Sequence, residues 1–442
     1  MDKLTELNNK LKRLENKIDV NRFIIHKINI WPIIRTFYLS EKFRIEFKED
    51  PVIKENFNLR LFYYHIIDFF KTYKIFTNKN KNLFLYYAKD PSSNLIINNQ
   101  TINKYFTPFQ YKYGKKNIFN IEIGKIDSSI PRTKALNISF LYFLVSPFFL
   151  IYYKFKLKAE LISISNYIKK FEALDKELIK NIDNFFALKL FFRILLIINK
   201  PKRVFVKSFD NLHSFSLVGA ANELGIETIE YQHGQQGENS LRYSNWNNIP
   251  IEGFKTIPKI FWLWEEIFEN KFSKWISSQK FHKTYVGGNV WAQHYSKYIE
   301  LGKIKIKNTP GKSNVLFCLQ FISIPKIIID VIKNSQDIIW YLRLHPRHKN
   351  DRQKLLNILN QNNISVQNIE IELSNDLILE ELIPNMDYVI SGYSTVLYEA
   401  YLLGKKAITI DSIGKEAYKE FINRKLIYYA SNAEKLTSLL KT

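Results

Sequence analysis

The residues best suited to chemistry lie in three short segments, each at the end of an apolar, β-prone run: 231–234, 343–347 and 391–395. In an open α/β sheet, ligands bind at the edge where strands end and helices begin. Two histidines and a group of hydroxyls at such an edge predict a site for a phosphorylated ligand.

Segment 343–347 is a cationic turn. His345 precedes Pro346, and proline restricts the preceding residue to extended geometry, so the imidazole is held at the strand's carboxyl end. Arg343 and Arg347 flank it, and guanidinium groups match phosphate oxygens bidentately. The turn predicts a contact to phosphate or nucleotide; an ordinary basic turn after a strand is the alternative.

Segment 391–395 joins a predicted strand to a predicted helix. Hydroxyls of Ser391, Ser394 and Thr395, together with backbone N–H groups, would form a phosphate cradle. Helix capping by Ser394 or Thr395 is the alternative. Glu399, one turn into the helix, would accept a hydrogen bond from a ribose hydroxyl if it faces the ligand, and would otherwise be a surface charge.

Segment 231–234 supplies a candidate general base. Histidine has a near-neutral reference pKa, so His233 is a residue type that can take a proton from an acceptor hydroxyl or stabilise developing charge. Gly234 allows a close backbone approach. A hydrogen-bonded structural histidine is the alternative. Asp210 and Glu238, at similar predicted sheet edges, are competing candidates for the base.

Alternating strands and helices must position these residues. Strands are predicted at 82–87, 203–207, 227–231, 259–263, 283–286, 315–319, 338–344, 388–390 and 407–410. Helices are predicted at 212–224, 324–333, 354–360, 376–383 and 396–403. This alternation predicts right-handed βαβ units and parallel sheets.

The predicted fold class is α/β, with two doubly wound Rossmann-type domains facing a cleft. Residues 1–300 form the first domain, in which 1–200 are mainly helical additions with one strand at 82–87. Residues 301–442 form the second, after a lysine-rich linker at 303–313.

Composition indicates a folded protein with anionic partners. Hydrophobic residues make up 46% of the chain, enough to fill two cores, so global disorder is excluded. A net charge of +23 indicates a lipid surface, a polyanionic acceptor or nucleic acid as partner, with solvated charge as the alternative. Cys318 is the only cysteine, which excludes an intrachain disulfide and fits a reducing compartment.

The most apolar stretch, 138–153, contains Pro147 and is shorter than the ~20 residues that a bilayer span needs. Lys154, Lys156 and Lys158 follow it at once. We expect either a buried helix or a helix that lies in a membrane interface. Peripheral attachment is therefore expected, not a span.

Taken in order, three stretches resemble the GT-B superfamily of bacterial surface-polysaccharide transferases, which includes capsule sialyltransferases, capsule Kdo transferases and CDP-glycerol glycerophosphotransferases. They read GIETIEYQHG (225–234), WYLRLHPRH (340–348) and MDYVISGYSTVLYEAYLLGKKAI (386–408), and the resemblance covers about residues 200–415. It implies a GT-B fold in which His345, Ser394 and Thr395, with Ser391 adjacent, bind a cytidine-nucleotide donor. It also implies that His233 is the base.

We therefore expect a metal-independent glycosyltransferase that builds a capsule, lipooligosaccharide or other surface glycan from a nucleotide sugar, with no cofactor beyond that co-substrate. The first choice of donor is CMP-linked sialic acid or a Kdo-type 2-keto acid, and the acceptor is a glycan or glycolipid. The expected location is the cytoplasm, peripherally at the inner membrane.

Three alternatives stay open. Two share the fold: a CDP-glycerol-type glycerophosphotransferase and a nucleotide-sugar epimerase. The third is a non-enzymatic basic protein that binds membrane or nucleic acid. Nucleic acid is not an expected partner of the enzyme, because the sequence carries neither an RNP motif nor a zinc finger.

Overall fold

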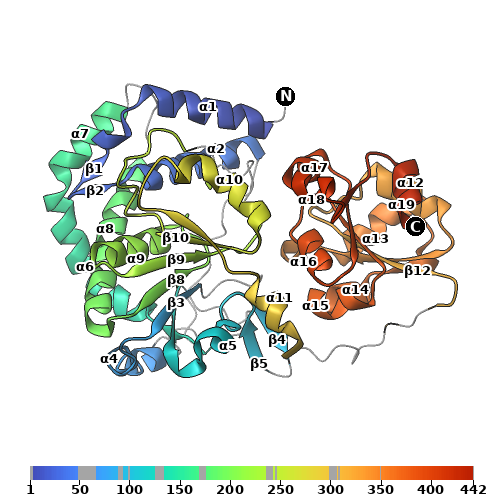
Figure 1. Ribbon diagram of the computed structural model, residues 1–442, viewed down its shortest axis with the longest axis horizontal. Coiled ribbons are helices and arrows are strands. Elements are labelled where there is room, and N and C mark those ends of the chain that lie inside the picture. The colour runs from blue at the N-terminus through green and yellow to red at the C-terminus, as the bar shows by residue number, and fades with distance from the viewer. Residues whose placement is uncertain are drawn as a thin grey trace. The chain divides into compact units, whose positions relative to one another are not determined.

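The computed structural model describes residues 3–47, 66–87, 93–97, 100–124, 134–168, 176–234, 242–243, 246–297, 306, 309–348 and 350–441 (Figure 1). Tertiary contacts divide the chain into two compact units, Met1–Asn289 and Val290–Thr442, called here the N-terminal and C-terminal units. The sequence placed this boundary between residues 300 and 301.

The N-terminal unit contains a parallel sheet of seven strands. In spatial order they are β11 (Lys283–Val286), β10 (Ile260–Leu263), β9 (Glu227–Tyr231), β8 (Arg203–Val206), β3 (Asn82–Tyr87), β6 (Ile118–Ile123) and β7 (Leu136–Asn137). From β3 the chain proceeds outward through β6 and β7, then returns to β8 and proceeds the other way to β11. The strand order therefore reverses between β3 and β8, which makes this pair the topological switch point of the sheet.

Helices cover this sheet because side chains alternate between its two faces. One face packs on α8 (Lys176–Asn199) and α9 (Leu212–Glu223), and this core includes Leu83, Leu85, Ile121, Val204, Val206, Leu188, Phe192, Leu195, Leu217 and Val218. Phe84 and Phe205 point to the other face, where they stack on each other and meet Phe109 of α5 (Phe109–Tyr113).

Further elements surround the sheet. They are α1 (Lys3–Lys17), β1 (Ile24–Ile25), β2 (Ile28–Asn29), α2 (Trp31–Phe47), α4 (Lys74–Thr77), β4 (Asn94–Ile97), β5 (Gln100–Asn103), α6 (Ser139–Lys156), α7 (Lys158–Ile168) and α10 (Glu266–Ile276). Figure 1 shows α6 beside α8, which it contacts.

The C-terminal unit contains a parallel sheet of six strands. Their spatial order is β14 (Ile369–Glu370), β13 (Ile338–Arg343), β12 (Ser313–Cys318), β15 (Tyr388–Ser391), β16 (Lys406–Thr409) and β17 (Tyr428–Tyr429). The order reverses between β12 and β15, the switch point of this sheet.

The helices of the C-terminal unit are α11 (Val290–His294), α12 (Lys326–Asn334), α13 (Arg352–Gln361), α14 (Glu372–Asp376), α15 (Leu379–Leu382), α16 (Val396–Leu402), α17 (Ser412–Ala417), α18 (Lys419–Asn423) and α19 (Ala433–Leu440). In the chain, α11 precedes the strands of this unit, α19 follows them, and the other helices lie between them. The core joins strand residues to α12, α13 and α19 through Val315, Phe317, Trp340, Leu342, Ile328, Val331, Leu355, Leu359, Leu436 and Leu440.

The predicted fold class, α/β with two doubly wound Rossmann-type domains, is confirmed, and the predicted strands end within two residues of their predicted bounds. Two expectations need correction. Residues 1–200 also supply β6 and β7 to the main sheet. The sequence does not predict β6, because polar residues interrupt its apolar run. Buried Glu122 accepts a hydrogen bond from Asn137 of β7 at 3.1 Å.

The predicted helix at 376–383 is wrong. Leu377 and Ile378 are extended, with ψ near 150°, and they separate α14 from α15. The side chains of Ser374 and Asn375 in α14 hydrogen-bond to the Leu342 carbonyl oxygen of β13, which holds α14 against the strand end.

A buried ion pair fixes α1 and α2 within the N-terminal unit. Arg35 Nε donates to Glu15 Oε1 at 2.8 Å, and Trp31 Nε1 donates to the same oxygen at 3.2 Å. Arg35 also lies 4.1 Å above the Trp246 ring. Asn248 donates to the Glu15 carbonyl oxygen at 2.8 Å. Both charged side chains are buried, so each depends on the other for compensation.

We predict that Glu15→Gln destabilises the N-terminal unit by about 3 kcal/mol, because it leaves the Arg35 charge buried without its counter-ion. Urea unfolding followed by tryptophan fluorescence measures this change. The control is Glu6→Gln in the same helix, whose exposed pair with Lys10 should contribute under about 1 kcal/mol. Equal midpoints for the two variants would show that the buried pair adds no stability.

Candidate functional site

The first candidate site lies at the N-terminal switch point, where β3 and β8 end. Asn211, the N-cap of α9, donates from Nδ2 to the hydroxyl oxygen of Tyr87 at 2.9 Å and accepts from Ser214 N at 3.0 Å. Ser214 Oγ also contacts the Tyr87 hydroxyl. Burial raises the pKa of Tyr87, so the hydroxyl stays neutral. The last residue of β3 is thereby joined to the first turn after β8.

His233 follows the end of the neighbouring strand, β9. Its Nδ1 lies 4.0 Å from Oε1 of Glu230, which is 1% exposed, whereas the imidazole is 28% exposed. Tyr243 donates to the same Glu230 oxygen at 2.7 Å, and burial, followed by the nearby Glu230 charge, raises the pKa of Tyr243 well above its usual value. The Tyr105 hydroxyl donates to the His233 carbonyl oxygen at 3.0 Å. A buried carboxylate therefore lies behind a partly exposed imidazole.

The two competing candidates for the base differ from His233. Both oxygens of Asp210, in the loop after β8, are engaged: Oδ1 accepts from Ser208 Oγ in the same loop, and Oδ2 pairs with Arg242 from the segment between β9 and β10. These contacts give Asp210 a role in holding the loop, and its role as a base stays a prediction. Glu238 lies outside the described residues.

Two further basic groups lie in the loops at this edge. Lys207, directly after β8, donates to Ser93 Oγ at 2.7 Å and lies 4.8 Å above the Tyr105 ring. His213 is in the first turn of α9, where burial lowers its pKa to about 4. His213 is therefore neutral at physiological pH, whereas Lys207 supplies positive charge.

The second candidate site lies at the C-terminal switch point, where β12 and β15 end. Gln320, just after β12, accepts from Tyr393 N at 3.2 Å and so joins the two strand ends. Thr409 Oγ1 bonds to the Gly392 carbonyl oxygen, and Tyr418 donates to the Ser394 carbonyl oxygen at 2.7 Å. The loop 391–395 is thus held by three neighbouring segments.

The predicted hydroxyls of this loop have different surroundings. Ser391 is buried and donates to the Cys318 carbonyl oxygen at 2.9 Å, so its hydroxyl joins β15 to β12. Ser394 and Thr395 are half-buried, and Ser394 Oγ accepts from Val396 N at 3.4 Å, a weak capping contact. Thr395, at the N-cap position, makes no side-chain capping bond. Phosphate binding by this loop stays a prediction, and Ser394 and Thr395 are the hydroxyls that could provide it.

Glu399, one turn into α16, is half-buried, and its Oε2 is shielded from solvent. It lies near the thiol of Cys318 at the end of β12. Burial raises the pKa of Cys318 to about 12, and the Glu399 carboxylate adds to that shift. Cys318 is therefore an unreactive thiol.

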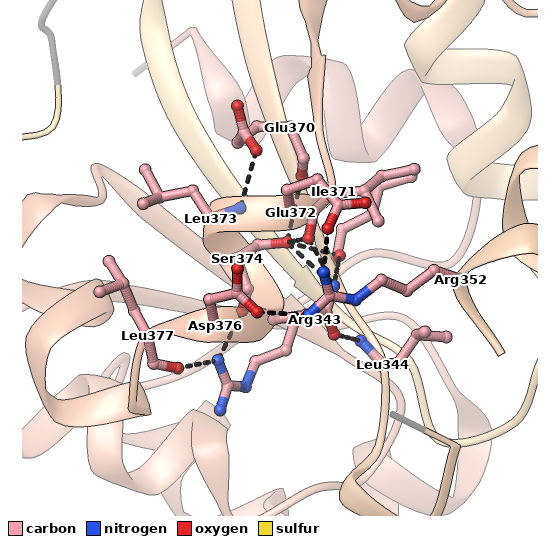
Figure 2. Close-up of polar contacts among 12 residues, drawn as sticks. Arg343, Leu344, Arg352, Glu370, Ile371, Glu372, Leu373, Ser374, Asp376 and Leu377 are labelled. Carbon is pink, nitrogen blue, oxygen red and sulfur yellow. Dashed lines mark hydrogen bonds and ion pairs between the residues drawn. The ribbon is translucent and has the colours of Figure 1, made fainter. Parts of the chain in front are cut away.

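Arg343 holds the turn that carries His345 (Figure 2). Its Nη1 donates to the carbonyl oxygens of Ser374 and Leu377, at 2.5 and 2.7 Å. Leu344 N donates to Asn375 Oδ1 at 2.8 Å. Segment 374–377 thus forms hydrogen bonds with the polar groups at the end of β13. These bonds fix the backbone just before His345.

The other residues of this turn are less constrained. His345 is half-buried, and its carbonyl oxygen accepts from His348 N at 2.8 Å. Pro346 is exposed and begins a 3₁₀ turn, Pro346–His348. The side chain of Arg347 lies outside the described residues. Phosphate binding by Arg343 and Arg347 stays a prediction.

Strand order brings part of the predicted set together. β13, β12 and β15 are parallel neighbours, so His345, Gln320 and the 394–395 hydroxyls belong to one sheet edge. His233 and Asp210 share the corresponding edge of the N-terminal sheet, on adjacent β9 and β8. In the part of the chain that the structure describes, no three His, Cys, Asp or Glu residues are grouped to hold a metal ion.

Sequence reasoning missed several of these residues. Gln320 directly follows a predicted strand, so the rule that selected His345 would also have found it. Glu230 lies inside a predicted strand, where an acidic residue is usually taken as solvent-facing. Tyr105 and Tyr243 come from segments without a motif, and only the fold brings them to the site.

Comparison with known proteins shows the fold. No family model matches the sequence, and no curated protein matches it. Among solved structures, a protein from Listeria monocytogenes assigned as a UDP-N-acetylglucosamine 2-epimerase matches with a TM-score of 0.51 and 12% identity, covering 82% of this chain and 88% of that one. The UDP-GlcNAc 2-epimerase of Methanocaldococcus jannaschii matches with a TM-score of 0.50 and 15% identity, covering 82% of this chain and 92% of that one. The wall teichoic acid polymerase TagF matches with a TM-score of 0.40 and 12% identity, covering 88% of this chain and 89% of that one.

The two epimerase structures match across both units, so the chain has the GT-B fold, with two Rossmann-type domains. At these identities the similarity concerns the fold alone.

We predict that Gly414→Ala destabilises the C-terminal unit by about 1–3 kcal/mol. A Cβ at this position would overlap the Gly392 carbonyl oxygen and Thr409 Oγ1, which together hold the 391–395 loop. Thermal unfolding measures the loss. The control is Gly219→Ala in α9, where the nearest atom lies at 3.6 Å and alanine favours the helix. If both variants unfold like the wild type, the 391–395 loop is not tightly packed.

Proposed function

We propose that the protein is an enzyme that uses a nucleotide-activated sugar, and specifically a glycosyltransferase that builds a surface glycan. The observation that carries this proposal is the carboxyl edge of the C-terminal sheet. His345 follows β13, and Ser394 and Thr395 follow β15, the two strands on either side of β12. Such an edge is where α/β folds bind nucleotides. The similar solved structures, which include enzymes that epimerise UDP-GlcNAc, support a nucleotide sugar as the substrate.

The proposed donor site uses side chains of different chemistry. His345 and the hydroxyls of Ser394 and Thr395 would bind the donor phosphate, with Arg347 adding positive charge from the same turn. Glu399 would accept from a ribose hydroxyl. Arg343 and Ser391 would act indirectly, because their contacts fix the strand ends that carry these residues. Together these groups would offset the negative charge that develops on the leaving nucleotide.

The proposed base is His233, because it is partly exposed and has a buried carboxylate behind it. Glu230 would favour the imidazolium that forms when the ring takes a proton from an acceptor hydroxyl. Tyr243 and Tyr105 would keep the carboxylate and the loop in place. Glu230 is thus a proposed positioning residue that acts through His233.

The proposed donor is CMP-linked sialic acid or a Kdo-type 2-keto acid, which follows from the resemblance of residues 225–234, 340–348 and 386–408 to capsule transferases. The proposed acceptor is a glycan or glycolipid, used in the cytoplasm by an enzyme attached peripherally to the inner membrane. CDP-glycerol transfer is an alternative within the fold. A nucleotide-sugar 2-epimerase is the second candidate, because two of the matching structures, each with a TM-score of at least 0.50, carry that name.

A donor screen tests the proposal. The purified protein is incubated with CMP-, CDP- and UDP-linked donors, and released nucleotide is measured. We expect CMP release that EDTA does not abolish. Conversion of UDP-GlcNAc to its 2-epimer without net nucleotide release would establish the epimerase instead. Absence of both reactions with every donor, in the presence and absence of membrane acceptors, would favour the non-enzymatic alternative.

In the same assay, His345→Ala should raise the donor KM by about 10-fold or more, since it removes a charge-assisted contact to phosphate. The control is His348→Ala. This histidine lies in the same turn, but its ring faces Asp351 at 3.3 Å. If His348→Ala impairs donor binding as much as His345→Ala, the effect comes from the turn as a whole and the assignment of His345 fails.

We predict that His233→Ala lowers kcat by about 10²–10⁴-fold, the usual contribution of a general base. Glu230→Gln should lower kcat by about 10-fold with little change in donor KM, because it affects only the orientation and charge of the base. It should also move the pH dependence of kcat. Glu227→Gln in the same strand, where Glu227 pairs with Arg203, should leave that profile unchanged. If the pH dependence of kcat for Glu230→Gln is identical to that of the wild type, Glu230 has a structural role only.

A further inference from the structure

The outer side of α6 is apolar and exposed. The helix Ser139–Lys156 carries no acidic residue, and none of its residues is fully buried. Residues at positions i, i+4, i+7 and i+11 of a helix share one side, and the exposed large side chains of α6 follow this spacing. Their exposed fractions run from 43% to 78%: Phe143, Leu144, Phe148, Ile151, Tyr152 and Phe155. A contiguous apolar surface of this kind marks an interaction site.

The opposite side of α6 is already occupied by the N-terminal unit. Leu141, Tyr142, Val145 and Phe149 pack against the core cluster formed by the sheet, α8 and α9. The Tyr142 ring meets Phe191 of α8 at 5.3 Å. A helix that is apolar all round is normally enclosed by protein or lipid. Among the residues that the structure describes, protein packs against one side of α6.

A second group of exposed aromatic side chains lies beside the start of α6. Phe70, Tyr73 and Phe76 are 57–73% exposed. Phe69, next to Phe70, packs edge-on against Phe140 of α6 with ring centroids 5.7 Å apart. The two groups therefore form one surface. We call it the apolar ridge, made of Phe70, Tyr73, Phe76, Phe143, Leu144, Phe148, Ile151, Tyr152 and Phe155.

The charges beside the apolar ridge identify its occupant. Lys154, Lys156 and Lys158 are exposed at the carboxyl end of α6. Lys156 lies 5.0 Å above the Tyr152 ring and donates to its hydroxyl at 2.7 Å. Long lysine side chains can keep their ammonium groups in the head-group layer while their stems cover apolar surface. Aromatic and aliphatic side chains followed by lysines are complementary to an anionic lipid surface.

Two acidic side chains lie near these lysines. Asp183 of α8 is partly buried; burial raises its pKa, which the charge of Lys154 opposes. Glu160 of α7 faces His26 at 3.8 Å. Neither belongs to α6, whose exposed side remains apolar and basic.

We infer that the apolar ridge docks the N-terminal unit on an anionic bilayer, with α6 lying in the plane of the interface. None of the helices that the structure describes is by itself long and apolar enough to cross a membrane. One pair, Ser139–Lys156 and Lys158–Tyr167, meets the criteria of length and composition together, with a bend of 63° between its members. Lys154, Lys156 and Lys158 lie around that bend, and the inner side of α6 is packed on the unit, so only the outer side can enter lipid.

This inference rests on the proposed function in one respect, the membrane location, and is independent of the transfer chemistry. Vesicle binding and nucleotide release can therefore fail separately. The first experiment is co-sedimentation of the full chain with phosphatidylglycerol-containing vesicles and with pure phosphatidylcholine vesicles. The variants are Phe148→Ser/Phe155→Ser and Lys154→Gln/Lys156→Gln. The control is Ile251→Ser/Val366→Ser, which removes exposed apolar side chains outside the apolar ridge.

We expect the wild type to bind anionic vesicles at least 10-fold more tightly than neutral ones. The phenylalanine pair should lower the partition coefficient on anionic vesicles by at least 10-fold. The lysine pair should lower it by about 10-fold and remove most of the preference for anionic lipid. The control should bind like the wild type. All variants should retain wild-type unfolding temperatures, because the substituted side chains are exposed.

A second measurement reports contact with lipid directly. Cys318, the only cysteine of the natural chain, is buried, and burial raises its pKa to about 12. The thiol introduced by Phe148→Cys can therefore be labelled selectively with an environment-sensitive fluorophore. Its emission should rise and shift to the blue with anionic vesicles. The same label at Ile251→Cys should not respond.

Two outcomes would overturn the inference. One is wild-type vesicle binding by Phe148→Ser/Phe155→Ser, which would separate the apolar ridge from any membrane attachment. The other is a protein that ignores vesicles but forms a dimer which the same variant dissociates in light-scattering measurements. The apolar ridge would then be an interface between two copies of the chain.

Discussion

Parallel pairing of every strand in both sheets is the constraint on which the candidate sites depend. In a parallel sheet all carboxyl ends lie at one edge, and the connections that leave two adjacent strands at a switch point diverge to opposite faces. The backbone alone cannot close the gap between them. Side chains do so here: Asn211 joins β8 to β3 through Tyr87, and Gln320 joins β12 to β15 through Tyr393. The same construction thus occurs in both units.

Buried polar side chains hold these edges rigid. A buried polar group is costly unless it is hydrogen-bonded, and several of those around the sites are hydrogen-bonded to neighbouring strands or side chains. Ser374 and Asn375 bond to the end of β13, Ser391 bonds to β12, and Glu230 accepts from Tyr243. Their geometry is therefore set by folding and need not be rebuilt when a ligand binds. His345 and His233 each follow such a fixed strand end, which is the arrangement that positions a reacting group.

The sequence predicts nine of the strands and their ends well, because most of these apolar, β-prone runs end at a polar residue or at Gly. Gly225 and Gly404, which follow α9 and α16, have left-handed backbone geometry. Prediction fails where a polar residue is buried inside an element: Glu122 conceals β6, and the burial of Glu230 within the correctly predicted β9 is not foreseen. Periodicity cannot distinguish such a residue from a solvent-facing one, since the partner that compensates its burial lies elsewhere in the chain.

The helix that carries most of the apolar ridge begins at the edge of the sheet that holds the N-terminal candidate site. Ser139, the first residue of α6, bonds to both the N–H and the carbonyl oxygen of Gly124, directly after β6. From β6 to β9 there are three strand spacings, roughly 15 Å, so the His233 loop is within reach of a head group of a few sugars. A net charge of +23 attracts any anionic surface over distances of about a Debye length, but diffuse charge does not select an orientation. Aromatic side chains that enter lipid do select an orientation, because the apolar ridge lies on one face of the unit. Docking on α6 would therefore place the carboxyl edge of the N-terminal sheet beside the membrane that holds a glycolipid acceptor.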